Sequence, residues 1–252
     1  MLALELVAVS AAGAAAGAFN ALAGAGSLIT FPTMVALGVP QLSANVTSTI
    51  GLIPGAIGGS IGYADLLTDQ GRRLARLVVP SLIGAAGGTA LLLATPGHTF
   101  EVVVPVLIAG SCILLLLQPT LARRMPHAGN ERSPALQGGL VIAGAYAAYF
   151  GSAVGVLLLA LLTLFVADAV QRLNGMKILL AGLMNLLAAV AYAFLAPVDW
   201  PFAVALMIAS LVGDRAGAHL ARRVSGGALR IAIACAGLVA AVVLAVQVIA
   251  GG

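Results

Sequence analysis

Charged residues are scarce in this sequence. They make up 8% of its 252 residues, whereas hydrophobic residues make up 62% and the mean hydropathy is +1.13. A soluble domain carries roughly a quarter of its residues as charges, so the surroundings of most of this chain must be lipid. Long stretches without a charged residue include 6–64, 102–122, 133–167, 178–198 and 231–252. Each can hold a membrane-spanning helix of about 20 residues.

Residues that build catalytic or metal sites are also few. Cys112 and Cys235 are the only cysteines and lie in apolar stretches, where we expect small buried side chains rather than a disulfide. His98, His127 and His219 are isolated near connections, and the sequence contains no paired carboxylates, metal-ligand cluster or nucleophile motif. The pattern predicts no enzyme, metal or cofactor. The pI near 9.6 does not indicate nucleic acid, because the basic residues flank apolar spans as the positive-inside rule describes.

The chain divides into eight apolar spans and one longer polar segment. The spans lie at about 3–37, 43–66, 76–95, 101–118, 136–166, 173–196, 201–220 and 229–250. Residues 122–134, ARRMPHAGNERSP, form the polar segment. The sequence therefore predicts an all-α polytopic membrane protein with a first repeat at 1–121, a cytoplasmic linker at 122–134 and a second repeat at 135–252.

The two predicted repeats begin alike. Span one contains GAFNALAGAGS and span five contains GAYAAYFGSAVG, with glycines at 17, 24 and 26 in the first and at 144, 151 and 155 in the second. An apolar run, a polar turn and an asparagine follow each time, at Asn45 and at Asn174. We expect the first span of each repeat to break, and to turn back into its own side of the membrane, at these glycines.

The positions of the basic residues favour one topology over another. If all eight spans crossed the membrane, the twelve basic residues would divide equally between its two sides. If spans one and five turn back at their glycines, all twelve share one side, as the positive-inside rule prefers. Each repeat then crosses three times and the second is inverted relative to the first, an architecture that recurs in transporters with interrupted helices.

Polar residues gather at the breaks and at the starts of the spans that follow them. A broken helix leaves backbone N–H groups unpaired, and a helix N-terminus carries a partial positive charge, so such a site can attract an anion. Helix packing and N-capping are the alternative roles for these glycines, hydroxyls and asparagines. The candidate binding residues are Asn20, Gly24, Gly26, Ser27, Asn45, Thr47, Ser48, Thr49, Gly151, Ser152, Gly155, Asn174, Lys177 and Asn185.

Few charges fall inside the spans. Lys177, the only lysine, is either a functional group or a side chain that extends to the membrane surface. Asp214 and Arg215 are adjacent, and we expect a local or an interhelical ion pair at this end of the span rather than a proton relay. Each negative charge that leaves an inside-negative cell gains roughly 2.3 kcal/mol per 100 mV, so a monoanion can be exported without a coupled ion. Proton coupling through Asp65 or Asp214 is the alternative that the sequence leaves open.

The order of these motifs resembles a known family. GAFNALAGAGSLITFP, SANVTSTIGLIPG, GAYAAYFGSAVGVLLLALL, VQRLNGMKILLAGLMN and PVDWPFAVALMIASLVGDRAGAHLARR are similar to segments of the sulfite exporter TauE/SafE family of small bacterial transporters. The resemblance covers nearly the whole chain and implies export of sulfite, an organosulfonate or a related anion across the bacterial inner membrane. The expected partners are a small anion and the lipid bilayer, with no nucleic acid, and a homo-oligomer is left open.

Departures from the family pattern leave the substrate undecided. Ala25 and Ser27 interrupt the first glycine cluster, and GSAVG at 151–155 departs further. A carrier of another small solute, a passive anion channel and a non-transporting membrane scaffold remain the alternatives.

Overall fold

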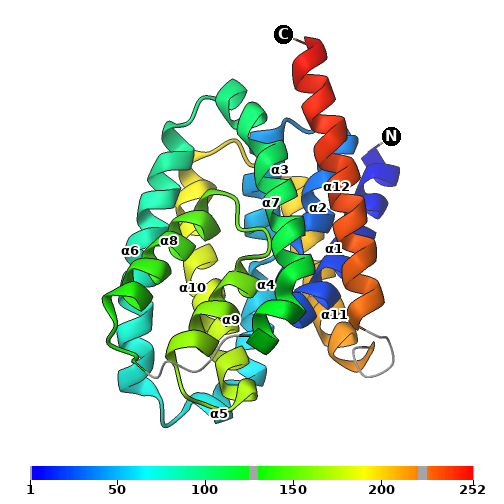
Figure 1. Ribbon diagram of the computed structural model, residues 1–252. Coiled ribbons are helices and arrows are strands. Elements are labelled where there is room, and N and C mark those ends of the chain that lie inside the picture. The colour runs from blue at the N-terminus through cyan, green and yellow to red at the C-terminus, as the bar shows by residue number, and fades with distance from the viewer. Residues whose placement is uncertain (1, 125–129, 221–225, 252) are drawn as a thin grey trace.

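The protein is a bundle of α-helices. The computed structural model describes residues 2–124, 130–220 and 226–251, and these ranges contain twelve helices and no strand (Figure 1). His127 and the arginines at 222 and 223 lie outside them, and the side chains of Arg123, Arg124, His219 and Arg230 are not described either. The helices are α1 (Leu2–Ala23), α2 (Ser27–Ala36), α3 (Gln41–Gly51), α4 (Ile53–Gly62), α5 (Ala64–Leu67), α6 (Gly71–Ala94), α7 (Gly97–Arg124), α8 (Pro134–Tyr149), α9 (Val154–Phe165), α10 (Val170–Leu195), α11 (Trp200–Leu220) and α12 (Gly226–Gly251).

The predicted all-α polytopic membrane architecture is confirmed. Within the described residues, five helices are long and apolar enough to cross a membrane, with spans at Ala3–Asn20, Gly71–Ala94, Gly97–Leu117, Val170–Leu195 and Ile231–Val248. Large apolar side chains cover the outside of the bundle; Phe194 is 84% exposed and Val106 70%. Lipid is the solvent in which such a surface is stable. Cys112 is buried as expected, but Cys235 is exposed on this outer surface, so its predicted burial is wrong.

Helices break at the glycines that the sequence singles out. Gly24 follows α1 with φ +67° and Gly151 follows α8 with φ +74°, a left-handed conformation that ends helices and favours glycine. The chain turns back at each break, so that α1 packs against α2 and α8 against α9. The two helical hairpins enter from opposite ends of the bundle, α1–α2 from the end where both termini lie and α8–α9 from the other (Figure 1).

A third interruption, which the sequence analysis missed, divides the second span. Helix α3 ends at Gly51 and α4 begins at Ile53, with Pro54 in its first turn. Proline has no N–H to donate to the preceding turn, and the Ser210 hydroxyl donates to the Gly51 carbonyl at this point, at 2.9 Å. The corresponding sixth span is the unbroken helix α10.

Two pairs of helices approach until their backbones touch. A Cβ atom on Gly17 of α1 would lie 2.2 Å from the Ser210 carbonyl oxygen of α11, and one on Gly144 of α8 would lie 2.2 Å from the Ser81 carbonyl oxygen of α6. Gly88 of α6 is equally close to α8. Small residues permit this approach in membranes, where packing and interhelical hydrogen bonds hold helices together. Each pair joins a helix of the first predicted repeat to one of the second.

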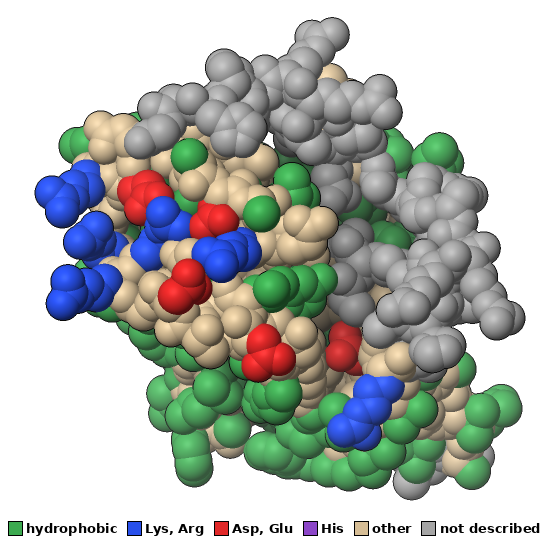
Figure 2. Space-filling model, turned by 90° about the horizontal axis from the view of Figure 1, so that it is seen from below, with side chains coloured by type: hydrophobic (Ala, Val, Ile, Leu, Met, Phe, Trp, Pro, Cys, Tyr) green, Lys and Arg blue, Asp and Glu red, His purple; other side chains and the backbone are tan. Residues whose placement is uncertain are grey.

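The described charges lie mainly at the ends of the bundle. We call the end at which α6 and α10 begin the basic end, and the other the opposite end. Arginines and acidic side chains gather at the basic end (Figure 2), whereas Glu5, Glu101 and Asp199 lie near the opposite end, in or beside the first turns of α1, α7 and α11. The described arginines of the basic end are Arg72, Arg73, Arg76, Arg132, Arg172 and Arg215.

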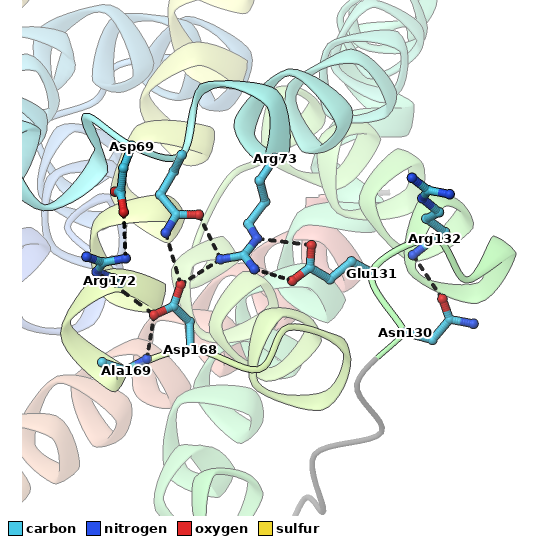
Figure 3. A network of polar contacts seen from close by, with 9 residues as sticks. Asp69, Arg73, Asn130, Glu131, Arg132, Asp168, Ala169 and Arg172 are labelled. Carbon is cyan, nitrogen blue, oxygen red and sulfur yellow. Dashed lines mark hydrogen bonds and ion pairs between the residues drawn. The ribbon is translucent and has the colours of Figure 1, made fainter.

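One arginine joins several segments at the basic end (Figure 3). Arg73 of α6 forms ion pairs of 2.6 Å with Glu131, which precedes α8, and with Asp168, which follows α9. Its guanidinium also donates to the Gln70 side chain at 2.7 Å. Arg172 pairs with Asp69 at 3.2 Å. Arg73 therefore fixes both ends of the α8–α9 hairpin to the start of α6.

Candidate functional site

A cavity of about 760 Å³ lies where the helix breaks meet α4, α10 and α11. This volume is sufficient for a small organic solute. Nine of the fourteen predicted binding residues line it: Asn20, Gly24, Ser27, Thr49, Gly151, Gly155, Asn174, Lys177 and Asn185. The sequence therefore predicted the lining residues that lie at the two helix breaks and on α10.

The two glycine breaks meet at the cavity. The hydroxyl oxygens of Ser27 and Ser152 lie 2.8 Å apart, and a Cβ atom on Gly24 would lie 3.0 Å from the Gly155 Cα atom. Helices α2 and α9 both begin here. Most N–H groups of their first turns donate to carbonyls of the preceding turn, as Leu28 does to Ala25, whereas the N–H groups of Ser27 and Gly155 have no such partner among the described residues. These N-termini contribute partial positive charge.

The other five predicted binding residues do not line the cavity and bind other parts of the protein. The Asn45 side chain donates to the Tyr149 carbonyl at 3.0 Å, and the Thr47 hydroxyl accepts from the Asp199 N–H at 3.0 Å. Ser48 shares a hydrogen bond with Thr30. Ser152 contacts Ser27 as described, and a Cβ atom on Gly26 would lie 2.7 Å from the Ala16 carbonyl oxygen, which indicates close packing within the α1–α2 hairpin.

The same contacts separate the cavity from the opposite end. Asn45, Thr47 and Ser48 all lie in α3, between the cavity and that end, and bind partners from three other segments. The rings of Phe31 and Phe150 pack edge to face beside them, with centroids 5.6 Å apart. The lining residues instead extend along α4, α10 and α11 to Tyr63, Asn174 and the exposed Arg215 near the basic end. The lining of the cavity therefore reaches exposed residues near the basic end, whereas the contacts of α3 lie on its side toward the opposite end.

Lys177 brings a full positive charge to the cavity wall. Its side chain is 2% exposed, so it does not extend to the surface, and the functional alternative is the one that its position supports. All four ion pairs among the described residues involve Arg73 or Arg172, and none reaches Lys177. An ammonium group buried without a carboxylate partner is costly, and a bound anion would remove much of that cost.

The sequence analysis missed the wall formed by α4. Gly55, Gly58, Gly59 and Gly62 line the cavity and recur at helical spacing after Gly51, which places them on one face of the helix. That spacing is legible in the sequence, but glycines of a membrane helix usually indicate helix packing. Their absent side chains instead leave space for a solute.

Asp214 and Arg215 also line the cavity, and neither forms a local or an interhelical ion pair with any residue whose side chain is described. Asp214 is 9% exposed, whereas Arg215 is exposed. Neighbouring residues on a helix point in different directions, and this separates the two charges. A carboxylate of Asp214 therefore lies in the same cavity as Lys177.

Comparison with known proteins gives two matches. The family model described as "Sulfite exporter TauE/SafE" matches residues 9–244. A Haemophilus influenzae protein described as "Probable membrane transporter protein" is 24% identical over 212 residues, which cover 82% of this chain and 82% of that protein. The residues that the family model matches include every residue that lines the cavity and the glycine breaks of both hairpins.

Proposed function

Because the chain belongs to the sulfite exporter TauE/SafE family and is a multi-pass membrane protein, we propose that it exports a small sulfur-containing anion by alternating access across the bacterial inner membrane. Sulfite and organosulfonates are the substrates that this proposal names. The observation that carries it is Lys177, a buried ammonium group on the wall of a solute-sized cavity, with none of the described carboxylates in ion-pair contact.

The environment of Lys177 suits an anion with several oxygen atoms. Lys177 supplies one full charge, and the starts of α2 and α9 supply the N–H groups of Ser27 and Gly155 and partial positive charge. Asn20, Ser27 and Asn185 add neutral groups that can donate hydrogen bonds to oxygen. A sulfite or sulfonate group presents three acceptors and needs donors from several directions, which such a ring of residues offers.

An inverted relation between the halves supports alternating access. Gly17 lies seven residues before the break glycine Gly24, and Gly144 lies seven residues before Gly151. Gly17 touches α11 in the way that Gly144 touches α6, with the same 2.2 Å distance from a Cβ position to a serine carbonyl. Exchanging the halves therefore exchanges the α1–α11 contact for the α8–α6 contact. In inverted-repeat transporters, one conformation of each half can be adopted by the other, which opens the site to alternate sides.

The charges at the basic end support one orientation of the protein in the membrane. The positive-inside rule places the arginine-rich end in the cytoplasm, so the exposed part of the cavity lining faces the cytoplasm, the side from which an anion is to leave. The contacts toward the opposite end, with Asn45, Thr47 and the Phe31–Phe150 contact, favour a carrier over a passive channel, which needs a continuous path.

Reconstituted protein tests this function. Liposomes that contain the purified protein and are loaded with sulfite are expected to release it faster than protein-free liposomes. Sulfite, thiosulfate or methanesulfonate is expected to raise the unfolding temperature of the purified protein more than acetate does. Single-channel currents in a planar bilayer would contradict alternating access, and a lack of both release and stabilisation would contradict anion transport.

A further inference from the structure

Asp214 is a second charged group on the cavity wall, and its role is not explained by binding of an anion. Its side chain is 9% exposed and lines the cavity from α11. Cβ atoms on Gly58 and Gly59 of α4 would lie 3.5 Å and 3.9 Å from its carboxylate oxygens. These glycines leave the carboxylate accessible from the cavity, because almost any other side chain there would cover it.

The carboxylate has no compensating partner among the described residues. None of the four ion pairs includes it, and none of the described hydrogen bonds ends on its oxygens. Ionisable groups buried in a membrane are costly and commonly mark ion or proton pathways. A structural role would require a partner, and the adjacent Arg215, which is exposed, does not supply one at ion-pair distance.

The charged and titratable groups around Asp214 are few. The facing residues of α4 are glycines, α3 carries no charged residue, and the single charge of α1, Glu5, lies at the far end of that helix. From α10 the charged group is Lys177. Tyr63 also lines the cavity, and its hydroxyl accepts a hydrogen bond from Asn174 at 3.1 Å. Lys177 and Asp214 are therefore the two buried charges of the cavity, and they have opposite signs.

Charge balance links the two residues to the substrate. Arg215 also lines the cavity, but its side chain is exposed and solvent screens its charge, so the balance is set by the two buried groups. In the empty cavity the ammonium of Lys177 and the carboxylate of Asp214 sum to zero. A monoanion beside Lys177 makes that sum negative and repels the carboxylate, unless Asp214 takes a proton from water at the basic end. With that proton the loaded cavity is neutral again. Anion binding and proton binding then strengthen each other by the same factor, as linkage requires.

Resting on the anion transport proposed above, we propose that Asp214 is a proton-binding site and that one proton leaves with each exported anion. A monoanion then leaves without net charge, and its own concentration gradient drives export. A dianion leaves with one net negative charge and is still driven by an inside-negative potential. The sequence alone left two alternatives, export of a monoanion without a coupled ion and proton coupling through Asp65 or Asp214, and this proposal adopts coupling through Asp214.

Calorimetry counts the protons directly. Methanesulfonate is the probe, because this monoanion does not titrate near neutral pH. Its binding heat is measured with purified protein at several values of pH, each in two buffers with different ionisation heats. We expect uptake of up to one proton per anion, and an affinity that rises as pH falls by up to about tenfold per pH unit. Asp214→Asn is expected to bind the anion with no proton uptake and with little dependence on pH.

Two further variants control the experiment. Asp214→Glu keeps a carboxylate and is expected to keep the proton uptake. Asp65→Asn removes an exposed carboxylate of α5 and is expected to behave as the unaltered protein. Anion binding without proton uptake by the unaltered protein overturns the proposal, whether or not Asp214→Asn folds, and so does sodium-dependent binding without proton uptake. Failure of every anion to bind contradicts the proposed function itself, which is a different result.

Discussion

Lys177 illustrates how a single residue can combine structural cost with functional use. Its side chain is buried and lines the same cavity as the starts of α2 and α9 and the α4 glycines. The sequence identified it because it is the only lysine and lies within an apolar span. The sequence could not decide whether the ammonium extends to the surface, because that depends on what packs around the side chain. Burial of the side chain answers the question.

Replacing Lys177 with methionine is expected to impair transport more than folding. Lys177→Met preserves the length and apolar body of the side chain and removes its charge, and hydrogen bonds to charged groups contribute about 1.5–3 kcal/mol. Sulfite efflux from loaded proteoliposomes is therefore expected to fall at least tenfold. The unfolding temperature without substrate is expected to stay the same or to rise, because a buried charge has been removed.

The matched control is Arg76→Met, which removes one positive charge from an exposed position of α6 at the same end of the bundle. It is expected to leave efflux unchanged. Equal efflux in Lys177→Met and the unaltered protein would remove Lys177 from the binding site.

At the scale of helices, close backbone contact between α6 and α8 positions the α8–α9 hairpin. Gly87 and Gly88 are adjacent in α6 but face different surroundings. A Cβ atom on Gly88 would lie 2.1 Å from the Ala145 carbonyl oxygen, whereas one on Gly87 would meet nothing within 4 Å. Gly88→Ala must force the two helices apart, and overpacking of this kind costs about 1–3 kcal/mol. We expect a lower unfolding temperature for Gly88→Ala.

Gly87→Ala is the matched control. Because alanine favours helix, its unfolding temperature is expected to be unchanged or slightly higher. Similar unfolding temperatures for the two variants would show that the helices are not in contact here.

The ion pairs of Arg73 make a separate prediction for the same hairpin. Glu131 lies three residues before α8 and Asp168 three residues after α9, and one guanidinium binds both. Arg73→Gln removes these pairs and is expected to speed amide hydrogen exchange at 130–133 and 166–169, because the ends of the hairpin lose their attachment to α6. Arg76→Gln, on the same helix and exposed, is expected to leave exchange there unchanged. Unaltered exchange in Arg73→Gln would mean that packing alone holds these segments.

The sequence predicted most of the helices and two of the three breaks, for identifiable reasons. Gly24 and Gly151 lie in clusters of small residues within spans too long for one crossing. The length of the span and its composition therefore both predicted a helix break at these positions. The break before Ile53 was missed because its span has an ordinary length, although Pro54 and Gly51 were visible signals. The wall formed by α4 and the position of Asp214 could not be predicted, because they depend on which faces of α4, α10 and α11 meet in space.

For the whole molecule, the close helix contacts indicate rigid units that differ from the predicted repeats at 1–121 and 135–252. Helix α1 is held to α11 and α6 is held to α8 by backbone contacts, so each close pair combines both halves of the chain. The cavity lies between these pairs, with α4 and α10 along it. A change of access then requires movement between the two pairs while each pair stays intact.

The orientation of the molecule in the membrane can be tested by labelling single cysteines. The proposed topology puts the α6–α7 and α10–α11 connections outside the cell and the segment before α8 in the cytoplasm. In a protein with Cys112→Ala and Cys235→Ala, Thr99→Cys and Val198→Cys are expected to react in intact cells with a thiol reagent that cannot cross the membrane. Asn130→Cys, at an exposed position, is expected to react only after the cells are opened, which also shows that this cysteine is accessible.

If all eight spans crossed the membrane, Thr99 and Val198 would lie on different sides. Reaction of only one of these two in intact cells would therefore contradict the inverted arrangement, as would reaction of Asn130→Cys before the cells are opened.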